Sequence, residues 1–353
     1  MTSTAVNRTP VSVVPAPSGN RSRKLPPVWL LIAGLLALAL ATFASVALGA
    51  RPLSLETVLQ ALTSPDPANG DHAVVLSRVP RTVAALLIGA ALGLAGTALQ
   101  GMTRNPLADP GIMGLNAGAA FAVVTAIYVF GITSFTGYVW FALAGTAVAA
   151  LIVYSVASLG REGATPVKLA LAGAGLTAGL TSLLSAILVT SRQTLDTFRF
   201  WQVGTVSGRG WDVLLPLIPF LAVGAAILLA SGRLLNGLSL GDDVARGLGQ
   251  NVNLSRGIMA VGVVLLCGAA TAAAGPIAFL GLVIPHLVRG LTGPDYRWIL
   301  VLAAVLAPVL LLVSDVVGRL VLPPGEVPVG IMTAVIGAPV FIAIIRRRKL
   351  AEL

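Results

Sequence analysis

Three arginines have the chemistry and the positions to bind an anionic partner. Arg78 and Arg81 flank a proline in the motif RVPR at the start of a long apolar run, and Arg319 follows another such run. Arginine is always charged and offers a planar fork of donors that fits carboxylates. It also anchors helix ends at a membrane surface by keeping its charged tip in water. The residues alone leave both interpretations open.

One carboxylate, Asp315, lies inside an apolar run, four residues before Arg319. Residues four apart share one face of a helix, so Arg319 is a possible ion-pair partner. Acids within a membrane are costly and are often functional, which makes a proton relay the alternative. An ion-coupled secondary transporter would need such an acid to titrate. An internal ion pair is at least as well supported.

Enzymatic motifs are missing or lie in the wrong context. The chain has three lysines, Lys24, Lys168 and Lys349, and none follows a glycine, so it carries no phosphate-binding P-loop. A GxSxG match at 237–241 falls in a polar connector rather than at a strand-to-helix elbow. We therefore expect no enzyme, no catalytic residue, and no cofactor or metal site in this chain. ATP and Mg²⁺ would belong to a partner ATPase.

The composition indicates a membrane protein. The 353 residues are 56% hydrophobic and only 10% charged, with a mean hydropathy of +0.93. Soluble domains carry about 25% charged residues. The apolar runs are about 20 residues long, enough to cross about 30 Å of hydrocarbon as a helix. They do not alternate with polar residues, which argues against a membrane barrel. The single cysteine, Cys267, cannot form an internal disulfide.

The pattern predicts an all-α integral membrane protein with about ten transmembrane helices. Residues 1–27 are rich in proline and basic residues and are expected to be a disordered tail. The membrane domain is expected over 28–345, followed by a basic cytoplasmic tail over 346–353. The expected spans are 28–50, 79–102, 111–130, 137–158, 168–190, 213–231, 257–274, 277–290, 297–317 and 328–345.

The distribution of basic residues predicts the orientation. With both termini in the cytoplasm, 16 of the 23 lysines and arginines lie on the inner side. Cytoplasmic segments of membrane proteins carry this excess. We therefore expect a multi-pass protein of a bacterial cytoplasmic membrane, with the three arginines above on its outer face.

Two cytoplasmic connectors have distinctive sequences. RNPLADPG at 104–111 contains two prolines and predicts a tight turn, which is either a simple hairpin or a constriction at the inner mouth of a pore. The segment 232–256 is the longest polar connector. Within it, Gly241 and Gly249 bound a short helix with Asp242 and Asp243 in its first turn, where acids suit the helix dipole. That helix is either a docking element for a cytoplasmic partner or part of an amphipathic loop.

Small and hydroxylated residues recur at helical intervals. Thr177, Thr181 and Ser185 share one face of the fifth span and either bond their own backbone or line a wet pathway. Glycines also recur at intervals that allow close helix packing. These are Gly89, Gly93, Gly96, Gly114, Gly118, Gly175 and Gly179. Packing within the chain is the simpler interpretation, and a dimer interface is the other.

Five motifs resemble the FecCD family, the permease subunits of type II ABC importers for iron-siderophores, haem and vitamin B12. They are RVPR at 78–81, GMTRNPLADPGIMGLNAGA from Gly101, LSLGDDVARGLG from Leu238, GPIAFLGLVIPHLVRGLTGPDYR from Gly275 and GEVPVGIMTAVIGAPVF from Gly325. They occur in the order of the family, and the resemblance as a whole covers about residues 28–349. The tail at 1–27 is outside the resemblance.

The resemblance implies a role for each motif. Arg78, Arg81 and Arg319 would dock an extracytoplasmic substrate-binding protein, and Asn105 and Leu107 would form the cytoplasmic gate. Residues Gly241, Asp242, Asp243, Ala245, Arg246, Leu248 and Gly249 would couple to a cytoplasmic ABC ATPase dimer. Thr177, Thr181 and Ser185 would line the path, although the fifth span varies within the family. His286 is interpreted as structural, not as an iron ligand.

The resemblance also implies an assembly and a cargo. A second permease subunit, identical or paralogous, would pair with this chain around a central path, with no nucleic acid involved. The expected function is ATP-driven import of a bulky iron chelate, with a ferric siderophore preferred on the base rate of the family. Haem and vitamin B12 stay open as cargo.

Overall fold

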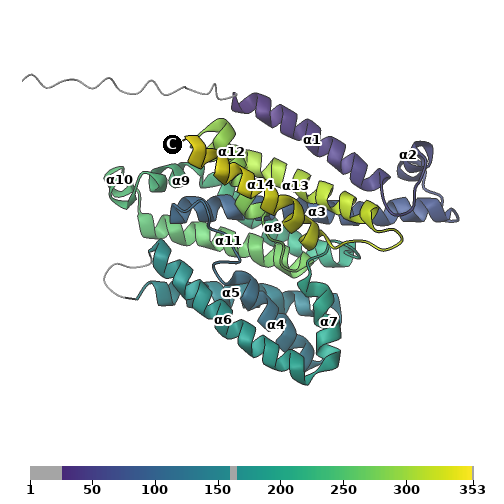
Figure 1. The fold of residues 1–353 in the computed structure, drawn as a ribbon, viewed down its shortest axis with the longest axis horizontal. Helices are drawn as coiled ribbons and strands as arrows, with labels where there is room; N and C mark the ends of the chain where they lie inside the picture. The colour runs from purple at the N-terminus through teal and green to yellow at the C-terminus, as the bar shows by residue number, and fades with distance from the viewer. Residues whose placement is uncertain (1–25, 160–164, 352–353) are drawn as a thin grey trace, which may run out of the picture.

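The computed structural model describes residues 26–159 and 165–351, and all regular structure in this part of the chain is helical (Figure 1). The helices are α1 Pro27–Ala47, α2 Leu55–Thr63, α3 Gly70–Thr103, α4 Leu115–Phe130, α5 Phe135–Ala157, α6 Pro166–Thr190, α7 Arg192–Gln202, α8 Trp211–Ala230, α9 Gly232–Ser239, α10 Asp242–Gly247, α11 Val252–Ala274, α12 Leu280–Thr292, α13 Tyr296–Val321 and α14 Val329–Ala351. Most of the predicted N-terminal tail lies outside the described residues. The predicted C-terminal tail begins as a continuation of α14.

Ten of these helices match the ten predicted spans. Seven are long and apolar enough to cross a membrane, namely α1, α3, α5, α6, α8, α11 and α13. Three shorter apolar helices cover Leu115–Phe130, Leu280–Thr292 and Val329–Ala343. The all-α prediction is therefore confirmed.

Helix α3 is longer than its predicted span, 79–102. Its 34 residues extend about 51 Å, well beyond the roughly 30 Å of hydrocarbon. The additional turns, from Gly70 to Arg78, are amphipathic. Val75 packs there against Val58 and Ala61 of α2 and Val46 of α1. A hydropathy pattern misses these turns because half of their residues are polar.

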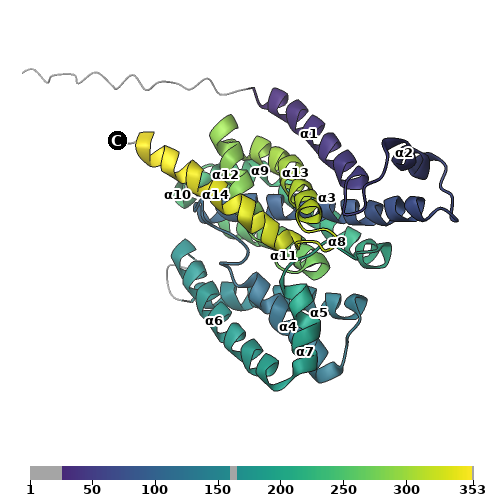
Figure 2. The same cartoon turned by 45° about the vertical axis from the view of Figure 1, so that its right-hand side comes forward.

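Helices α3, α11 and α13 form the centre of the molecule, and α1 and α6 lie at its margin (Figures 1 and 2). In the most apolar stretch of each central helix, most residues are buried: 78% in α3, 67% in α11 and 61% in α13. The corresponding shares are 17% in α1 and 11% in α6. Glycines allow the central helices to approach closely. A Cβ on Gly93 would lie 2.6 Å from the carbonyl oxygen of Ala303 in α13. Gly96 contacts the backbone of Gly281 in α12 in the same way.

The close-packing interpretation does not hold for every glycine. Gly118 lies against Gly145 of α5, as packing within the chain requires. By contrast, a Cβ on Gly175 or Gly179 of α6 would meet nothing within 4 Å in the described structure. In the described part of the chain, these two glycines therefore have open space where a side chain would be, not a packed neighbour.

The molecule has two polar ends. Helix α10 lies at one end and α2 at the other, and α1 runs from the α10 side to α2 (Figures 1 and 2). The last turn of α14 also lies toward the α10 side. The first and last described helices therefore place their outer termini toward the same end, as an even number of spans requires.

Candidate functional site

The three predicted arginines converge at the α2 end. Arg78 and Arg81 are one turn apart on α3, and Arg319 lies in the last turns of α13. Asp315 lies between two of them, with its Oδ1 2.7 Å from Nη2 of Arg81 and its Oδ2 3.1 Å from Nη2 of Arg319. The predicted i,i+4 ion pair is confirmed. Arg81 is a second partner that the sequence did not reveal.

Arg78 and Arg319 bind the end of α1. Both are buried, with exposed fractions of 7% and 4%. They donate hydrogen bonds of 2.8–3.1 Å to main-chain carbonyl oxygens, those of Ser45, Val46, Ala47, Leu48 and Arg51. The last carbonyls of a helix have no partner within the helix, so these arginines satisfy them. Both arginines therefore anchor a helix end, but through buried carbonyl contacts and not with the charged tip in water.

Arg81 connects the buried ion pairs to an open hollow. Its Nη1 lies 2.7 Å from Oε2 of Glu326 and donates to Oγ of Ser207 at 3.2 Å. Glu326 is 34% exposed, whereas Asp315 is 2% exposed. Burial alone would raise the pKa of Glu326, but the hydrogen bond from Ser207 and the charge of Arg81 outweigh it and lower that pKa. Glu326 therefore carries a negative charge at neutral pH.

We call this depression the arginine hollow. Its volume is about 650 Å³, and its charged lining residues are Arg51, Arg78, Arg81, Arg209, Arg319 and Glu326. The motifs singled out neither Arg51 nor Arg209. Arg51 is 61% exposed and pairs with Asp71 at 2.6 Å. Arg209 stacks on Phe135 at 3.7 Å, and burial lowers its pKa to about 10, so it stays protonated at neutral pH.

The connector after α3 forms the predicted tight turn at the α10 end. Oδ1 of Asn105 accepts a hydrogen bond of 2.9 Å from the main-chain nitrogen of Leu107. The carbonyl oxygen of Asn105 accepts another from Ala108 at 3.1 Å. The side chain of Leu107 is 46% exposed. The turn is confirmed, and the gate role of Asn105 and Leu107 stays a prediction.

The predicted short helix between Gly241 and Gly249 is α10. Both glycines have positive φ angles, +113° and +81°, which delimit the helix at each end. Ala245 lies on the inner face of this helix and is fully buried, whereas Val244 and Leu248 are 48% and 70% exposed. The helix therefore presents apolar side chains outward at a polar end of the molecule.

Other predicted members of this segment form ion pairs. Arg246 pairs with Asp243 at 2.9 Å within α10. Asp242 accepts from Arg256 of α11 at 3.0 Å and lies 3.3 Å from Arg104, which follows α3. Short polar contacts therefore connect the start of α10 to two membrane helices.

The predicted hydroxyl face of α6, Thr177, Thr181 and Ser185, bonds in part to its own helix backbone, and its role in lining a pathway stays a prediction. Thr177 donates to the carbonyl of Gly173 and Ser185 to that of Thr181, each at 2.8 Å. The same face, with Gly111 and Ile112, lines a hollow of about 730 Å³. The hydroxyl hydrogens of Thr177 and Ser185 are used within the helix, so their oxygens offer acceptors to this hollow. His286, 5% exposed, lies edge-on to Phe341 at 6.0 Å and is part of the packing.

Residues 36–347 match the model of the FecCD transport family. This chain belongs to that family. It is 45% identical over 315 residues to the ferric enterobactin transport system permease protein FepD of Escherichia coli (strain K12), covering 89% of this chain and 94% of FepD. It is 44% identical over 329 residues to the iron(3+)-hydroxamate import system permease protein FhuB of Bacillus subtilis (strain 168), covering 93% and 85%.

A solved structure supports the same assignment. An inward-facing conformation of a metal-chelate type ABC transporter superposes with a TM-score of 0.79 at 30% identity, covering 91% of this chain and 99% of the other. The FecCD chain described here is therefore a multi-pass membrane protein and a permease subunit of a bacterial ABC importer, not its ATPase. The alternative of an ion-coupled secondary transporter is wrong. Asp315, the acid it would need, is held by two arginines.

Proposed function

We propose that this FecCD permease carries a ferric siderophore across the cytoplasmic membrane, driven by ATP hydrolysis in a partner subunit. Curated relatives that match most of its length are named for ferric enterobactin and iron(3+)-hydroxamate transport. The arginine hollow at one end and the exposed α10 at the other provide surfaces for two different partners. Haem and vitamin B12 are the alternative cargoes, and binding of the purified cargo-binding partner to each chelate separates them.

The α10 end is the cytoplasmic end in this proposal. Arg104, Arg246, Arg256 and Arg297 lie at this end, and the RRRK sequence at 346–349 ends α14 on the same side. Basic residues accumulate on the cytoplasmic side of membrane proteins. Both termini are then cytoplasmic, and the arginine hollow faces outward.

The arginine hollow is the proposed docking site of an acidic substrate-binding protein. The single observation that supports this most strongly is its charge, because five arginines and one glutamate line it. Arg78 and Arg319 shape the site by fixing the end of α1. Arg81 and Arg51 are the arginines we expect to meet the partner's carboxylates, since Arg81 reaches the open side and Arg51 is the most exposed.

We predict opposite effects from two substitutions in this hollow. Arg51→Glu should lower the affinity for the binding protein about tenfold, or about 1.4 kcal/mol, because it reverses a charge at the rim. Glu326→Gln should raise the affinity, because it removes the carboxylate that competes for Arg81. The measurement is titration of the labelled binding protein onto the permease in nanodiscs at two salt concentrations. Equal affinities for both variants and the parent would contradict the assignment. Arg78 is unsuited to this test because it also holds α1.

Helix α10 is the proposed contact with the ATPase. Val244 and Leu248 protrude from a polar end of the molecule, where apolar side chains of this size indicate a partner surface. The acids Asp242 and Asp243 at its start and Arg246 near its end suit the helix dipole and support a helix this short.

Leu248→Glu should prevent stable assembly with the ATPase. A charge in the centre of an apolar contact costs binding free energy of about 2 kcal/mol or more, a loss of about thirtyfold. Leu159 at the end of α5 provides the matched control, because it is 71% exposed where Leu248 is 70% exposed. Co-purification of the ATPase should fall for Leu248→Glu and persist for Leu159→Glu. Equal recovery of the ATPase with both variants would contradict the docking role of α10.

The exposed face of α6 is the proposed wall of the transport path. Only 11% of its most apolar stretch is buried within this chain, and Thr177, Thr181 and Ser185 face an open hollow. A second permease subunit, identical or paralogous, would close the path from the other side. The hydroxyl oxygens form a weakly polar, uncharged surface, which suits passage of a bulky chelate without tight binding.

A further inference from the structure

A single carboxylate connects three elements at the α10 end. Oδ1 of Asp242, the first residue of α10, accepts a hydrogen bond of 3.0 Å from Nη2 of Arg256 in α11. The same oxygen lies 3.3 Å from Nη2 of Arg104, which caps α3. We call Arg104, Asp242 and Arg256 the Asp242 cluster. Its members come from the coupling segment, the start of the gate connector and a central membrane helix.

Arg104 is placed to control the gate connector. It ends α3 with a left-handed backbone, φ 51° and ψ 29°, and the next residue is Asn105. Its guanidinium also lies against the turn before α10, where a Cβ on Gly241 would be 3.6 Å from Nη1 of Arg104. Arg104 therefore sets the chain direction into the Asn105–Leu107 turn, and its own side chain contacts α10 through Asp242.

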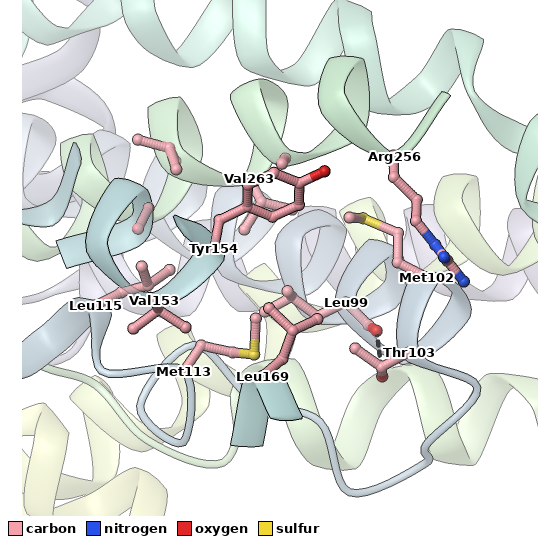
Figure 3. Close-up of a pocket in the computed structure, with 13 residues that line it drawn as sticks. Leu99, Met102, Thr103, Met113, Leu115, Val153, Tyr154, Leu169, Arg256 and Val263 are labelled. Carbon is pink, nitrogen blue, oxygen red and sulfur yellow. Dashed lines mark hydrogen bonds between the residues drawn. The ribbon is translucent and has the colours of Figure 1, made fainter. Parts of the chain in front are cut away.

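Arg256 fixes the other side of the cluster to the membrane domain. Its side chain runs along an apolar cavity of about 70 Å³ and lies beside Met102 and Thr103 in the last turn of α3 (Figure 3). It is 16% exposed, compared with 41% for Arg104. Arg256 is therefore the more buried partner of Asp242, and Arg104 is the more exposed one.

We propose that the Arg104–Asp242 contact links the coupling helix to the gate. This inference rests on the proposed function, in which the ATPase binds α10 and residues Asn105 and Leu107 form the gate. Displacement of α10 moves Asp242, and the ion pair passes that movement to Arg104 and so to the residues that follow it. Arg104 is then a positioning residue, because it acts on the gate through the backbone that follows it.

Loss of this link should uncouple the transporter without unfolding it. The pair is partly exposed, and exposed ion pairs contribute little to stability. For Arg104→Ala in the full complex in proteoliposomes, we expect normal ATPase assembly. We expect about tenfold less ferric chelate taken up per ATP hydrolysed, within the usual range of coupling between two sites. Arg104→Lys should restore part of the ratio because it keeps the charge.

Arg297 provides the matched control for this experiment. It is an exposed arginine at the same end, paired with Asp295 at 2.9 Å, and has no contact with α10 among the described interactions. Arg297→Ala should keep the parent ratio of uptake to hydrolysis. A parental ratio in Arg104→Ala, or the same fall in Arg297→Ala, would overturn the inference.

A thiol at the gate separates this inference from the function on which it rests. Cys267, the only cysteine of this chain, is buried, so Leu107→Cys adds the single accessible thiol of this chain. Its labelling rate should change when ATP binds the complex, and adding Arg104→Ala should remove that change. If Leu107→Cys alone does not respond to ATP, the gate assignment is wrong. If it responds equally with and without Arg104→Ala, the gate stands and the link is wrong.

Discussion

Asp315→Ala should lower the free energy of unfolding by about 3–5 kcal/mol, the usual cost of removing one partner from a buried ion pair. Asp315 is 2% exposed and binds Arg81 and Arg319, whose side chains are 14% and 5% exposed. Without the carboxylate, the buried guanidinium of Arg319 and the largely buried one of Arg81 face each other with no negative charge between them. Arg319 also holds the end of α1, so α1 and α13 should separate more easily.

The single cysteine provides the measurement. Cys267 is fully buried in α11, and a dye that fluoresces on reaction with thiols will report its exposure as the protein unfolds on heating. Glu326→Ala is the control, because it removes another partner of Arg81 that is 34% exposed. We expect that control to change stability by about 1 kcal/mol or less. Matching unfolding temperatures for Asp315→Ala and the parent would show that the buried pair is not needed for stability.

The Asp315 pair also shows which contacts a sequence reveals. Asp315 and Arg319 are four residues apart on one helix, so helical geometry alone predicts their contact. Arg81 is 234 residues from Asp315, and no local rule brings them together. The same holds for Arg78, whose motif is visible but whose acceptors are carbonyls at the end of α1 and just after it. Motifs identify a residue of interest, while its partners depend on the tertiary packing.

The helices themselves were largely predictable, because an apolar run of membrane-spanning length has few other stable structures. Their ends were less so. The eighth span was expected from 277, but α12 begins at Leu280 because Phe279 has a positive φ of 70°. The short amphipathic helices α2 and α7 were not predicted, since nine and eleven residues with mixed polarity give a weak hydropathy signal. Helix α10 was predicted because glycines flank it.

The regularly spaced glycines fall into two groups, those packed against a neighbouring helix and those that face open space. Their spacing in the sequence does not distinguish the two groups. Gly96 of α3 and Gly175 of α6 occur in similar small-residue contexts. Gly96 faces the backbone of Gly281 in α12, whereas Gly175 has open space where a Cβ would be. Which face of a membrane helix meets a neighbour depends on how the whole bundle is arranged. The two positions therefore provide a matched pair of substitutions.

Gly96→Ala should strongly destabilise the protein, and Gly175→Ala should not. The new methyl group at 96 would overlap the Cα and carbonyl oxygen of Gly281, and main-chain atoms cannot rotate away as a side chain does. Overpacking of this kind costs about 1–3 kcal/mol or more. Alanine favours a helix over glycine by up to about 1 kcal/mol at either position, so Gly175→Ala should be neutral or slightly stabilising. Thermal exposure of Cys267 in the isolated subunit measures both. If the two variants unfold together, α3 and α12 are not in the close contact described here, and the half of the bundle nearer α10 must pack differently.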